Sequence, residues 1–238
     1  MKKSDYLIKF ENIRKTYVTG PVEYEALKGI DINIAKGEFV AIIGHSGSGK
    51  STIMNIMGAL DSPSSGKYYL RGKDISGYDQ DELAEIRNRE IGFIFQSFNL
   101  LPRMSVLKNV ERPMLYAGYP EEKRKERAME VLKAVGLDDK ASNLSNHISG
   151  GQIQRVAIAR ALTMNPSILM ADEPTGNLDT KTAHEVMNFF VDLNKKGSTI
   201  ILITHEDDIA AFAKRVIKIT DGLVESANYK LETASFIK

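Results

Sequence analysis

Apolar residues follow two patterns along the chain, and each pattern predicts a different kind of strand. Apolar and polar side chains alternate over residues 6–11 and 30–34, which is typical of half-buried antiparallel strands. Residues 39–43, 168–171 and 199–204 form short, largely apolar runs instead. Runs of this kind are typical of strands that are buried on both faces of a parallel sheet.

Apolar residues at helical spacing lie between these runs. Helices are expected around residues 152–164 and 180–195, and a further helix begins near Lys50. Strands that alternate with helices predict an α/β fold with a mostly parallel core sheet, covered on both faces, beside a small N-terminal antiparallel β subdomain. One buried face of the helix near Lys50 is predicted from four residues: Ile53, Ile56, Met57 and Leu60.

The middle of the chain has a different character. From Gln96 to about Ile148 no buried strand is expected, and residues 120–135 have the pattern of a charged amphipathic helix. We therefore expect a helical subdomain that is inserted into the α/β core. The predicted organisation is a single cassette, 1–238, with its core at 1–95 and about 160–225, the helical subdomain at about 96–159, and a tail without motifs at 226–238.

Composition narrows the range of functions. A length of 238 residues fits one α/β domain, and a net charge of +1 argues against nucleic acid as the main partner. The absence of cysteine excludes disulfides and thiolate metal sites. No apolar run is long enough to span a bilayer, and the polar start of the sequence, residues 1–5, lacks the apolar core of an export signal. We therefore expect a cytoplasmic protein.

A phosphate-binding loop follows the first buried strand. Residues 44–51 match the pattern G-x-x-x-x-G-K-S, in which glycines let backbone amides converge on phosphate oxygens at a helix N-terminus. Lys50 supplies a positive charge to the β- and γ-phosphates, and the Ser51 hydroxyl can coordinate Mg²⁺. The sequence thus predicts a site for ATP and Mg²⁺ that includes Gly44, His45, Ser46, Gly47, Ser48, Gly49, Lys50, Ser51 and Thr52.

Two acidic residues end the second buried strand. Asp172 stands where P-loop enzymes place a carboxylate that is associated with Mg²⁺, and Glu173 can accept a proton from the attacking water. An acidic pair after a strand is, taken alone, more often a solvated strand end. The phosphate-binding loop in the same chain favours the catalytic interpretation, because the backbone turns at a strand end and both carboxylates can then reach one site.

A second glycine-rich segment can close over the same phosphates. Ser149, Gly150, Gly151 and Gln152 open a helix whose N-terminus can face an anion, although plain helix capping by Ser149 is the alternative. One chain cannot easily fold both this segment and the loop at 44–51 onto one nucleotide, whereas two copies arranged head to tail can. The two motifs together predict a dimer that is driven by ATP.

The stretch from Ile148 to Leu162 resembles the signature motif of ATP-binding-cassette (ABC) ATPases. Ile148 replaces the usual leucine and Ile153 a more common glutamine, and neither change removes a phosphate contact. The resemblance covers residues 6 to about 225. It implies that Tyr17 stacks on adenine, that Gln96 touches Mg²⁺ and senses a membrane partner, that Asp179 lies in a loop crossing the dimer interface, and that His205 contacts the γ-phosphate.

The roles implied by the motifs and the resemblance can be grouped by chemistry. The residues assigned to catalysis are Glu173, His205, Lys50 and Gln96. Those assigned to the metal are Ser51, Gln96 and Asp172. The nucleotide contacts outside the loop at 44–52 are Tyr17, Ser149, Gly150, Gly151, Gln152 and Asp179.

The segments 24–29, 54–58 and 91–102 resemble the ATPase subunits of macrolide-efflux, lipoprotein-release and antimicrobial-peptide-resistance permeases. This resemblance implies a permease that docks near 96–115 and holds the chain at the inner face of the membrane. An importer subunit and an ATPase that transmits force to the cell envelope or division machinery remain alternatives. A soluble ABC protein acting on ribosomes or DNA is disfavoured by the near-neutral charge, and residues 149–155 exclude a nucleotide kinase.

Overall fold

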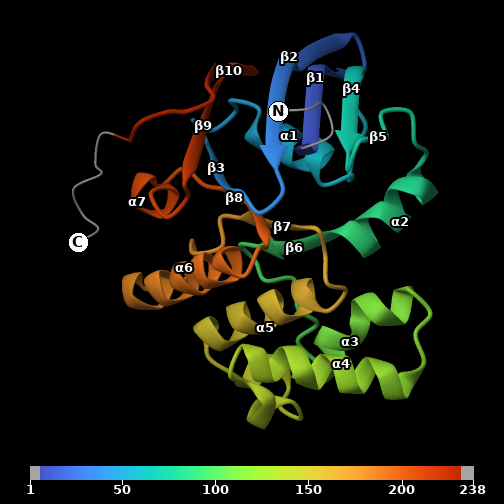
Figure 1. Ribbon diagram of the computed structural model, residues 1–238, viewed down its shortest axis with the longest axis vertical. Coiled ribbons are helices and arrows are strands. Elements are labelled where there is room, and N and C mark those ends of the chain that lie inside the picture. Colours follow the sequence, from blue (N-terminus) through green and yellow to red (C-terminus); the bar gives the residue numbers. More distant parts are fainter. Residues whose placement is uncertain (1–5, 232–238) are drawn as a thin grey trace. The chain divides into compact units, whose positions relative to one another are not determined.

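The computed structural model describes residues 6–231, which form two compact units (Figure 1). Among the described residues, the first unit contains 6–84 and 191–231, and the second contains 85–190. Helices α2 (Gln80–Glu90) and α6 (Thr180–Lys195) cross the two boundaries. The α6 bounds confirm the helix predicted at 180–195, whereas α2 was not predicted.

An antiparallel sheet makes up the N-terminal part of the first unit. Its strands β1 (Tyr6–Thr19), β2 (Val22–Ala35), β4 (Ser65–Leu70) and β5 (Lys73–Asp74) are arranged in the order β2-β1-β4-β5. The two alternating segments of the sequence lie in β1 and β2, so the prediction of antiparallel strands is confirmed. Buried residues such as Ile8 and Phe10 form the core face of the sheet.

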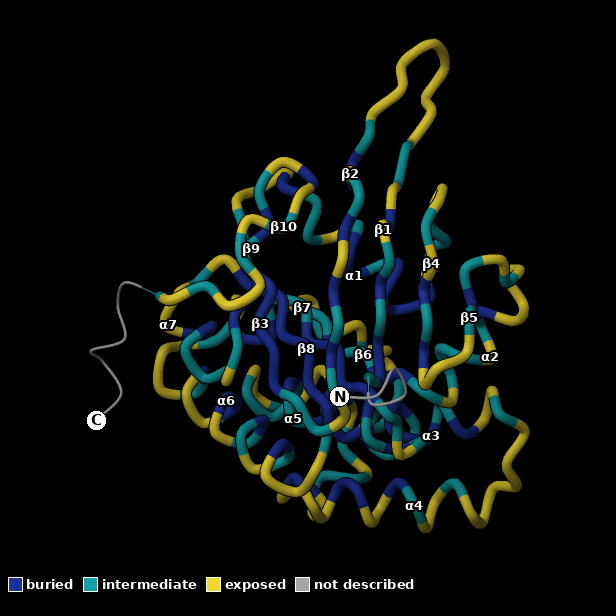
Figure 2. The backbone as a smooth tube through the Cα atoms, turned by 45° about the horizontal axis from the view of Figure 1, so that its top comes forward, coloured by how far each residue is buried: buried dark blue, intermediate teal, exposed yellow. Residues whose placement is uncertain are grey.

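The β1–β2 hairpin is longer than the alternating pattern indicates. β1 pairs with β4 only as far as Arg14, and the remainder of the hairpin extends past β4 as largely exposed chain (Figure 2). The hairpin turns at Gly20, whose φ of +60° is a conformation that glycine adopts without strain. The register around this turn places Tyr17 opposite Tyr24.

The parallel strands of the first unit carry the phosphate-binding loop. β3 (Phe39–Ile43) pairs in parallel with β8 (Thr199–Ile203) and β9 (Arg215–Thr220), and β10 (Leu223–Ser226) pairs antiparallel with β9. Every residue of β3 and β8 is buried, which confirms the prediction from their continuous apolar runs. The strands β9 and β10 were not predicted.

The helix after the loop is shorter than predicted. α1 (Lys50–Met57) buries Ile53, Ile56 and Met57 as expected. Leu60 was assigned to the same buried face, but it lies beyond the helix end at Gly58 and is exposed. The helix periodicity does not extend past the C-cap, so the assignment of Leu60 is wrong. A short helix, α7 (Asp207–Ala210), follows β8.

The second unit combines two parallel strands with a bundle of helices (Figure 1). β6 (Ile91–Phe95) pairs in parallel with β7 (Ile168–Asp172). The helices are α3 (Val106–Tyr116), α4 (Glu121–Ala134) and α5 (Gly150–Leu162), with short 3₁₀ turns at Asp138–Lys140 and Ser145–His147. A buried apolar cluster packs these helices together: Val106, Val110, Ala128, Val131, Leu132, Val135, Leu137, Val156 and Ala159.

The helical character predicted for the middle of the chain is confirmed. Between 96 and 148 the described residues form one isolated β-bridge, Ser105 with Leu144, and no strand. The helix expected at 120–135 is α4, and the one expected at 152–164 is α5, which begins two residues earlier. The predicted subdomain of 96–159 lies inside the second unit, and its boundaries remain a prediction.

One buried amide orders the segment that leads into α3. Asn109 is fully buried, accepts a hydrogen bond from the Leu101 N–H at 2.8 Å and donates to the Leu101 and Ser105 carbonyls at 3.1 Å each. A buried amide is stable only when its polar atoms are paired, so Asn109 fixes the loop between β6 and α3.

None of the described helices is long and apolar enough to span a membrane. The predicted tail begins at the end of β10, and its residues 232–238 lie outside the described part of the chain.

Candidate functional site

The phosphate-binding loop lies between β3 and α1 in the first unit. Gly49 has a φ of +107° and precedes the helix, and no side chain caps the first turn of α1. The backbone amides of this turn therefore remain available to an anion. His45, Ser46, Gly47 and Ser51 are exposed on the loop, while Ser48 is buried.

Lys50 bends back over the loop. Its Nζ donates hydrogen bonds to the carbonyl oxygens of Gly44 at 2.6 Å and His45 at 2.9 Å. The ammonium thus lies beside the backbone of the loop that leads into α1. The arrangement places one positive charge and a set of backbone donors in the same small region, which is the donor set that phosphate oxygens require.

The loop is braced from behind by the turn between β9 and β10. The Gly222 N–H donates to the Ser48 carbonyl at 2.9 Å. A Cβ on Gly44 would lie 2.3 Å from the Ile219 carbonyl oxygen and 2.6 Å from the Ser48 Oγ, so only glycine fits there. The buried Ser48 hydroxyl has no hydrogen-bond partner among the described residues. This bracing was not predicted, because the 219–222 segment carries no motif.

Tyr17, the predicted adenine contact, lies on β1 with 37% of its surface exposed. Its hydroxyl donates to Asp61 Oδ2 at 3.3 Å, and Lys15 Nζ lies 5.1 Å from the ring centre. Lys15 also pairs with Asp61 at 2.7 Å. The ring is therefore held by a cation and a carboxylate that sequence reasoning did not identify.

A second tyrosine in this region was missed. Tyr24 stands opposite Tyr17 on β2, and its hydroxyl donates to the Gly47 carbonyl of the phosphate-binding loop at 3.4 Å. The signal was available, since a turn at 20–21 pairs 17 with 24. Tyr24 adds a contact between the hairpin and the loop.

His205 lies two residues after β8 and is exposed. The preceding Thr204 is buried, and its hydroxyl accepts a hydrogen bond from the Glu206 N–H at 3.1 Å. This bond fixes the backbone on both sides of His205. The residue stands, as predicted, at the carboxyl end of a parallel strand, which is where open α/β sheets bind ligands.

In the second unit, Asp172 is the last residue of β7 and Glu173 follows it directly. Both are partly exposed. Glu173 adopts a φ of +44°, a left-handed conformation that is uncommon for residues other than glycine. The Gly176 N–H donates to the Glu173 carbonyl at 3.2 Å. The backbone therefore turns sharply at Glu173, as the sequence predicted.

The structure brings the Gln96 and Asp179 loops together within the second unit. Asn177 Nδ2 donates to the Gln96 carbonyl at 2.8 Å, and a Cβ on Gly176 would lie 2.6 Å from Gln96 Nε2. Asp179 accepts hydrogen bonds from the Thr182 N–H at 3.1 Å and hydroxyl at 2.6 Å. The bonds from Thr182 lower the pKa of Asp179, so this exposed carboxylate is charged at neutral pH.

The signature segment forms a capping box at the start of α5. The Gln152 N–H donates to Ser149 Oγ at 3.4 Å, and the Ser149 N–H donates to Gln152 Oε1 at 3.0 Å. Ser149 therefore caps α5, which is the role that the sequence offered as the alternative to a phosphate contact. Gly150 is exposed, and a Cβ there would meet only Leu178 at 3.9 Å. Gly151 is closer packed, because a Cβ on it would lie 2.6 Å from Thr182 Cγ2.

A buried glutamine on the same helix was also missed. Gln154 is fully buried, and its Nε2 donates to the Pro174 carbonyl at 2.6 Å. The signal was a polar residue on a face of the helix that Ala157 and Ile158 mark as apolar. Gln154 links the helix of the signature segment to the turn that carries Glu173.

Comparison with known proteins identifies the family of this chain. The family model described as "ABC transporter" matches residues 27–176, more than half of the chain. An uncharacterized ABC transporter ATP-binding protein, YknY of Bacillus subtilis, is 51% identical over 222 residues, which are 93% of this chain and 96% of that protein. The macrolide export ATP-binding/permease protein MacB of Chlorobaculum tepidum is 52% identical over 218 residues.

The relation to MacB covers only part of that protein. The aligned residues make up 92% of this chain and 33% of the MacB length, so this chain spans about a third of it. Among solved structures, the dimeric structure of MJ0796, a bacterial ABC transporter cassette, has a TM-score of 0.83 at 46% identity and covers 92% of this chain and 97% of that chain.

A second structure of the same cassette is described as a dimeric post-hydrolysis state bound to ADP and Pi, with a TM-score of 0.83 at 45% identity. The fold and the family predicted from the signature motif are confirmed by these comparisons. The chain belongs to the ABC transporter family, as an ATP-binding and ATP-hydrolysing cassette.

Proposed function

We propose that this chain is the ATPase subunit of a membrane transporter and that ATP drives two copies together head to tail. The observation that carries the proposal is the presence, in one chain, of a phosphate-binding loop before α1 and an exposed, glycine-rich N-terminus of α5. Each is suited to one side of a phosphate chain. The dimeric structures of the related cassette MJ0796 support the same arrangement.

The residues of the loop fit a nucleotide phosphate. The uncapped first turn of α1, the Lys50 ammonium and the exposed Ser51 hydroxyl together offer backbone donors, a positive charge and an oxygen ligand. Ser51, Gln96 and Asp172 would hold Mg²⁺, because all three supply the oxygen ligands that this hard cation prefers. Mg²⁺, when bound, supplies charge neutralisation on the β- and γ-phosphates.

The remaining roles follow the sequence prediction. Glu173 orients the attacking water and accepts its proton, and His205 stabilises charge on the γ-phosphoryl group. Tyr17 stacks on adenine. Residues 149–152 of a second copy close over the γ-phosphate, with Asp179 at the interface. Water replaces ADP on the γ-phosphoryl group, which leaves as inorganic phosphate. Residues 149–152 of the second copy then lose their phosphate contact, and the dimer reopens.

The transport role is proposed from the relatives. Several relatives at 49–52% identity are macrolide export ATP-binding/permease proteins, which supports efflux among the predicted efflux, lipoprotein-release and peptide-resistance systems. In these relatives the permease belongs to the same polypeptide, so we infer that a membrane-embedded partner holds this chain at the cytoplasmic face of the membrane. An importer subunit, or an ATPase that transmits force without moving a substrate, is the competing function.

The docking surface for the permease is proposed at 96–115, and its exposed apolar side chains support it. Leu101 and Leu115 are 39% and 49% exposed, and Tyr116, at the end of α3, is 67% exposed. Contiguous exposed apolar patches mark interaction surfaces in soluble proteins, and these side chains are the candidates for such a patch here. They continue into Tyr119, which is 41% exposed.

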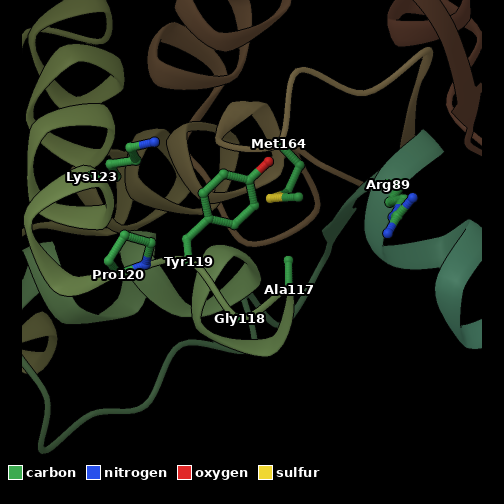
Figure 3. Close-up of a pocket in the computed structure, with 7 residues that line it drawn as sticks. All are labelled: Arg89, Ala117, Gly118, Tyr119, Pro120, Lys123 and Met164. Atoms are coloured by element: carbon green, nitrogen blue, oxygen red, sulfur yellow. The ribbon is translucent and has the colours of Figure 1, made fainter.

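The segment that follows this surface along the chain lines a cavity. It measures about 500 Å³ and is lined by Arg89, Ala117, Gly118, Tyr119, Pro120, Lys123 and Met164. Figure 3 shows the Tyr119 ring next to Met164, with Arg89 on one side of the cavity and Lys123 on the other. Arg89 also forms an exposed ion pair with Glu85 at 3.1 Å. An apolar floor between two cations suits a permease segment that carries an acidic and an apolar side chain.

Copurification of a membrane partner tests this proposal. Tagged protein isolated from detergent-solubilised native membranes should retain an integral membrane protein, identified by mass spectrometry. The double variant Arg89→Glu, Lys123→Glu should lose at least about 90% of it, since like charges facing an acidic segment cost several kcal/mol. Lys133→Glu, on the same helix α4 but outside the cavity, is the matched control and should retain it.

The identity of the recovered protein separates the candidate functions. A permease with a large extracytoplasmic domain supports efflux or lipoprotein release. A compact permease together with a solute-binding protein would make the chain an importer subunit. Recovery of ribosomal or DNA-bound proteins alone would overturn the transporter assignment.

A further inference from the structure

The glutamine that links α5 to the Glu173 turn has no role in the function described so far. Gln154 lies in the second turn of α5, two residues after the capping box, and is fully buried. Its Nε2 donates to the Pro174 carbonyl at 2.6 Å, while its Oε1 has no hydrogen-bond partner among the described residues. The side chain therefore makes one short bond and leaves one buried acceptor unpaired.

The half-satisfied amide argues against a purely stabilising role. A buried acceptor without a partner is unfavourable, and an apolar side chain of similar size would avoid that cost. What the amide does provide is a donor at one specific carbonyl. That carbonyl belongs to the residue that directly follows Glu173.

The turn that receives this bond is unusual. Glu173 has a φ of +44°, and a non-glycine residue keeps such a conformation only when its surroundings enforce it. Hydrogen bonds from near and far in the sequence hold the turn. One is local, from the Gly176 N–H to the Glu173 carbonyl at 3.2 Å, and another comes from Gln154 on a different element.

We propose that Gln154 is a positioning residue that holds the Glu173 carboxylate in its reactive orientation and couples it to the start of α5. The coupling rests on the proposed function, in which residues 149–152 contact the nucleotide of a second copy. Because α5 is a continuous helix, a shift of its N-terminus on that contact moves Gln154 and hence the Pro174 carbonyl. In each copy, the orientation of the Glu173 carboxylate therefore depends on whether the α5 of the same copy contacts the nucleotide of the other copy.

Steady-state hydrolysis by the Gln154→Leu variant tests the positioning role. We expect kcat to fall roughly tenfold, because ångström-scale displacement of a reacting group costs up to about a hundredfold. The KM for ATP should stay within about twofold, since a positioning defect acts on the chemical step and not on uniform binding. The Hill coefficient for ATP should also fall toward one if the two sites are coupled through this bond.

Thr163→Val is the matched control at the other end of α5. Thr163 is buried, and its hydroxyl proton is shared between the Val110 and Ala159 carbonyls at O···O distances of 3.1 and 3.0 Å, so its loss also removes buried hydrogen bonding from this helix. We expect its melting temperature to fall at least as much as that of Gln154→Leu, with kcat unchanged. An equal loss of kcat in both variants would mean that any weakening of α5 is sufficient, and would overturn the proposal.

Making the Gln154→Leu change in a protein that already carries Glu173→Gln distinguishes failure of this proposal from failure of the function on which it rests. If Gln154 acts through Glu173, then Gln154→Leu should cause no further loss in a Glu173→Gln variant, because the base is already removed. The same tenfold loss in both backgrounds would show that Gln154 acts elsewhere. If Glu173→Gln itself hydrolyses ATP at the normal rate, the proposed function fails instead.

The Gln154→Glu variant provides a pH readout. A protonated carboxyl can donate to the Pro174 carbonyl, whereas a carboxylate cannot, and burial raises the pKa of a carboxyl. Hydrolysis relative to the unaltered protein should therefore recover as the pH falls from about 8 to about 6. A ratio that stays constant over this range would contradict the requirement for a donor.

Discussion

Replacing Glu173 by glutamine should slow ATP hydrolysis at least about a hundredfold while ATP binding persists, because general-base catalysis contributes about a hundredfold or more. Glutamine has the same shape as glutamate but does not accept the proton of the attacking water. Glu173 is partly exposed in a turn with φ +44°, and its replacement changes one atom type without adding volume. The fold should therefore be unchanged.

The same variant should accumulate as a dimer. When hydrolysis is blocked, ATP stays between the two copies, and light scattering in ATP and Mg²⁺ should report twice the monomer mass. Glu130→Gln, an exposed carboxylate paired with Arg127 on α4, is the control and should hydrolyse normally. A Glu173→Gln protein that stays monomeric in ATP and hydrolyses it at the normal rate would contradict the assignment.

Lys50→Ala should weaken ATP binding by about ten- to a hundredfold and abolish measurable hydrolysis. Hydrogen bonds to charged groups contribute about 1.5–3 kcal/mol each, and tenfold in affinity corresponds to about 1.4 kcal/mol. The variant also loses the bonds from Nζ to the Gly44 and His45 carbonyls, which brace the loop. Both effects act against phosphate binding.

Titration calorimetry with ATP and Mg²⁺ measures this loss. Lys36→Ala removes an exposed lysine from the turn between β2 and β3 and serves as the matched control, because it changes the net charge equally. Its affinity for ATP should equal that of the unaltered protein. Equal affinity in the Lys50→Ala variant would mean that the phosphates bind elsewhere.

Much of the fold could be predicted because its buried strands are continuous apolar runs. Residues 39–43 and 199–203 have no polar face, so burial on both sides is the only arrangement that hides them. β4 and α2 were missed, since their few buried positions are interleaved with polar ones. β9 was missed because charged residues, Arg215 and Lys218, interrupt its apolar ones. Leu60 was misplaced because helix periodicity alone does not show where a helix ends.

The sequence motifs of the site could be predicted, but the hydrogen bonds between segments far apart in the sequence could not. Lys50 and Glu173 are recognisable from their neighbours in sequence. The contact of Tyr24 with Gly47 and the bond from Gln154 to Pro174 join segments that are 23 and 20 residues apart. Such contacts depend on strand register and on the packing of α5, which local patterns specify only weakly.

The central claim is that each ATP site combines the phosphate-binding loop of one copy with the signature segment of another. Gly150→Asp is suited to removing the signature function. A Cβ at this position meets only Leu178 at 3.9 Å, and an acidic side chain in the first turn of α5 interacts favourably with the helix dipole. The substitution should therefore leave the helix folded. Its charge nevertheless repels a phosphate placed at that N-terminus. Gly150→Ala, which adds the Cβ without the charge, should remain active.

The most direct measurement is ATP hydrolysis by an equal mixture of Lys50→Ala and Gly150→Asp proteins, each of which should be inactive alone. In a mixed dimer, the intact loop of one copy faces the intact signature segment of the other, which rebuilds one site of the two. About half of randomly formed dimers are mixed, so independent sites would give about a quarter of the normal rate per total protein. The Glu173 of the rebuilt site belongs to the Gly150→Asp copy, whose own α5 does not dock, so the coupling through Gln154 lowers this rate by up to about tenfold and leaves it measurable. A mixture that stays inactive, or a Gly150→Asp protein that is fully active alone, would contradict the shared site.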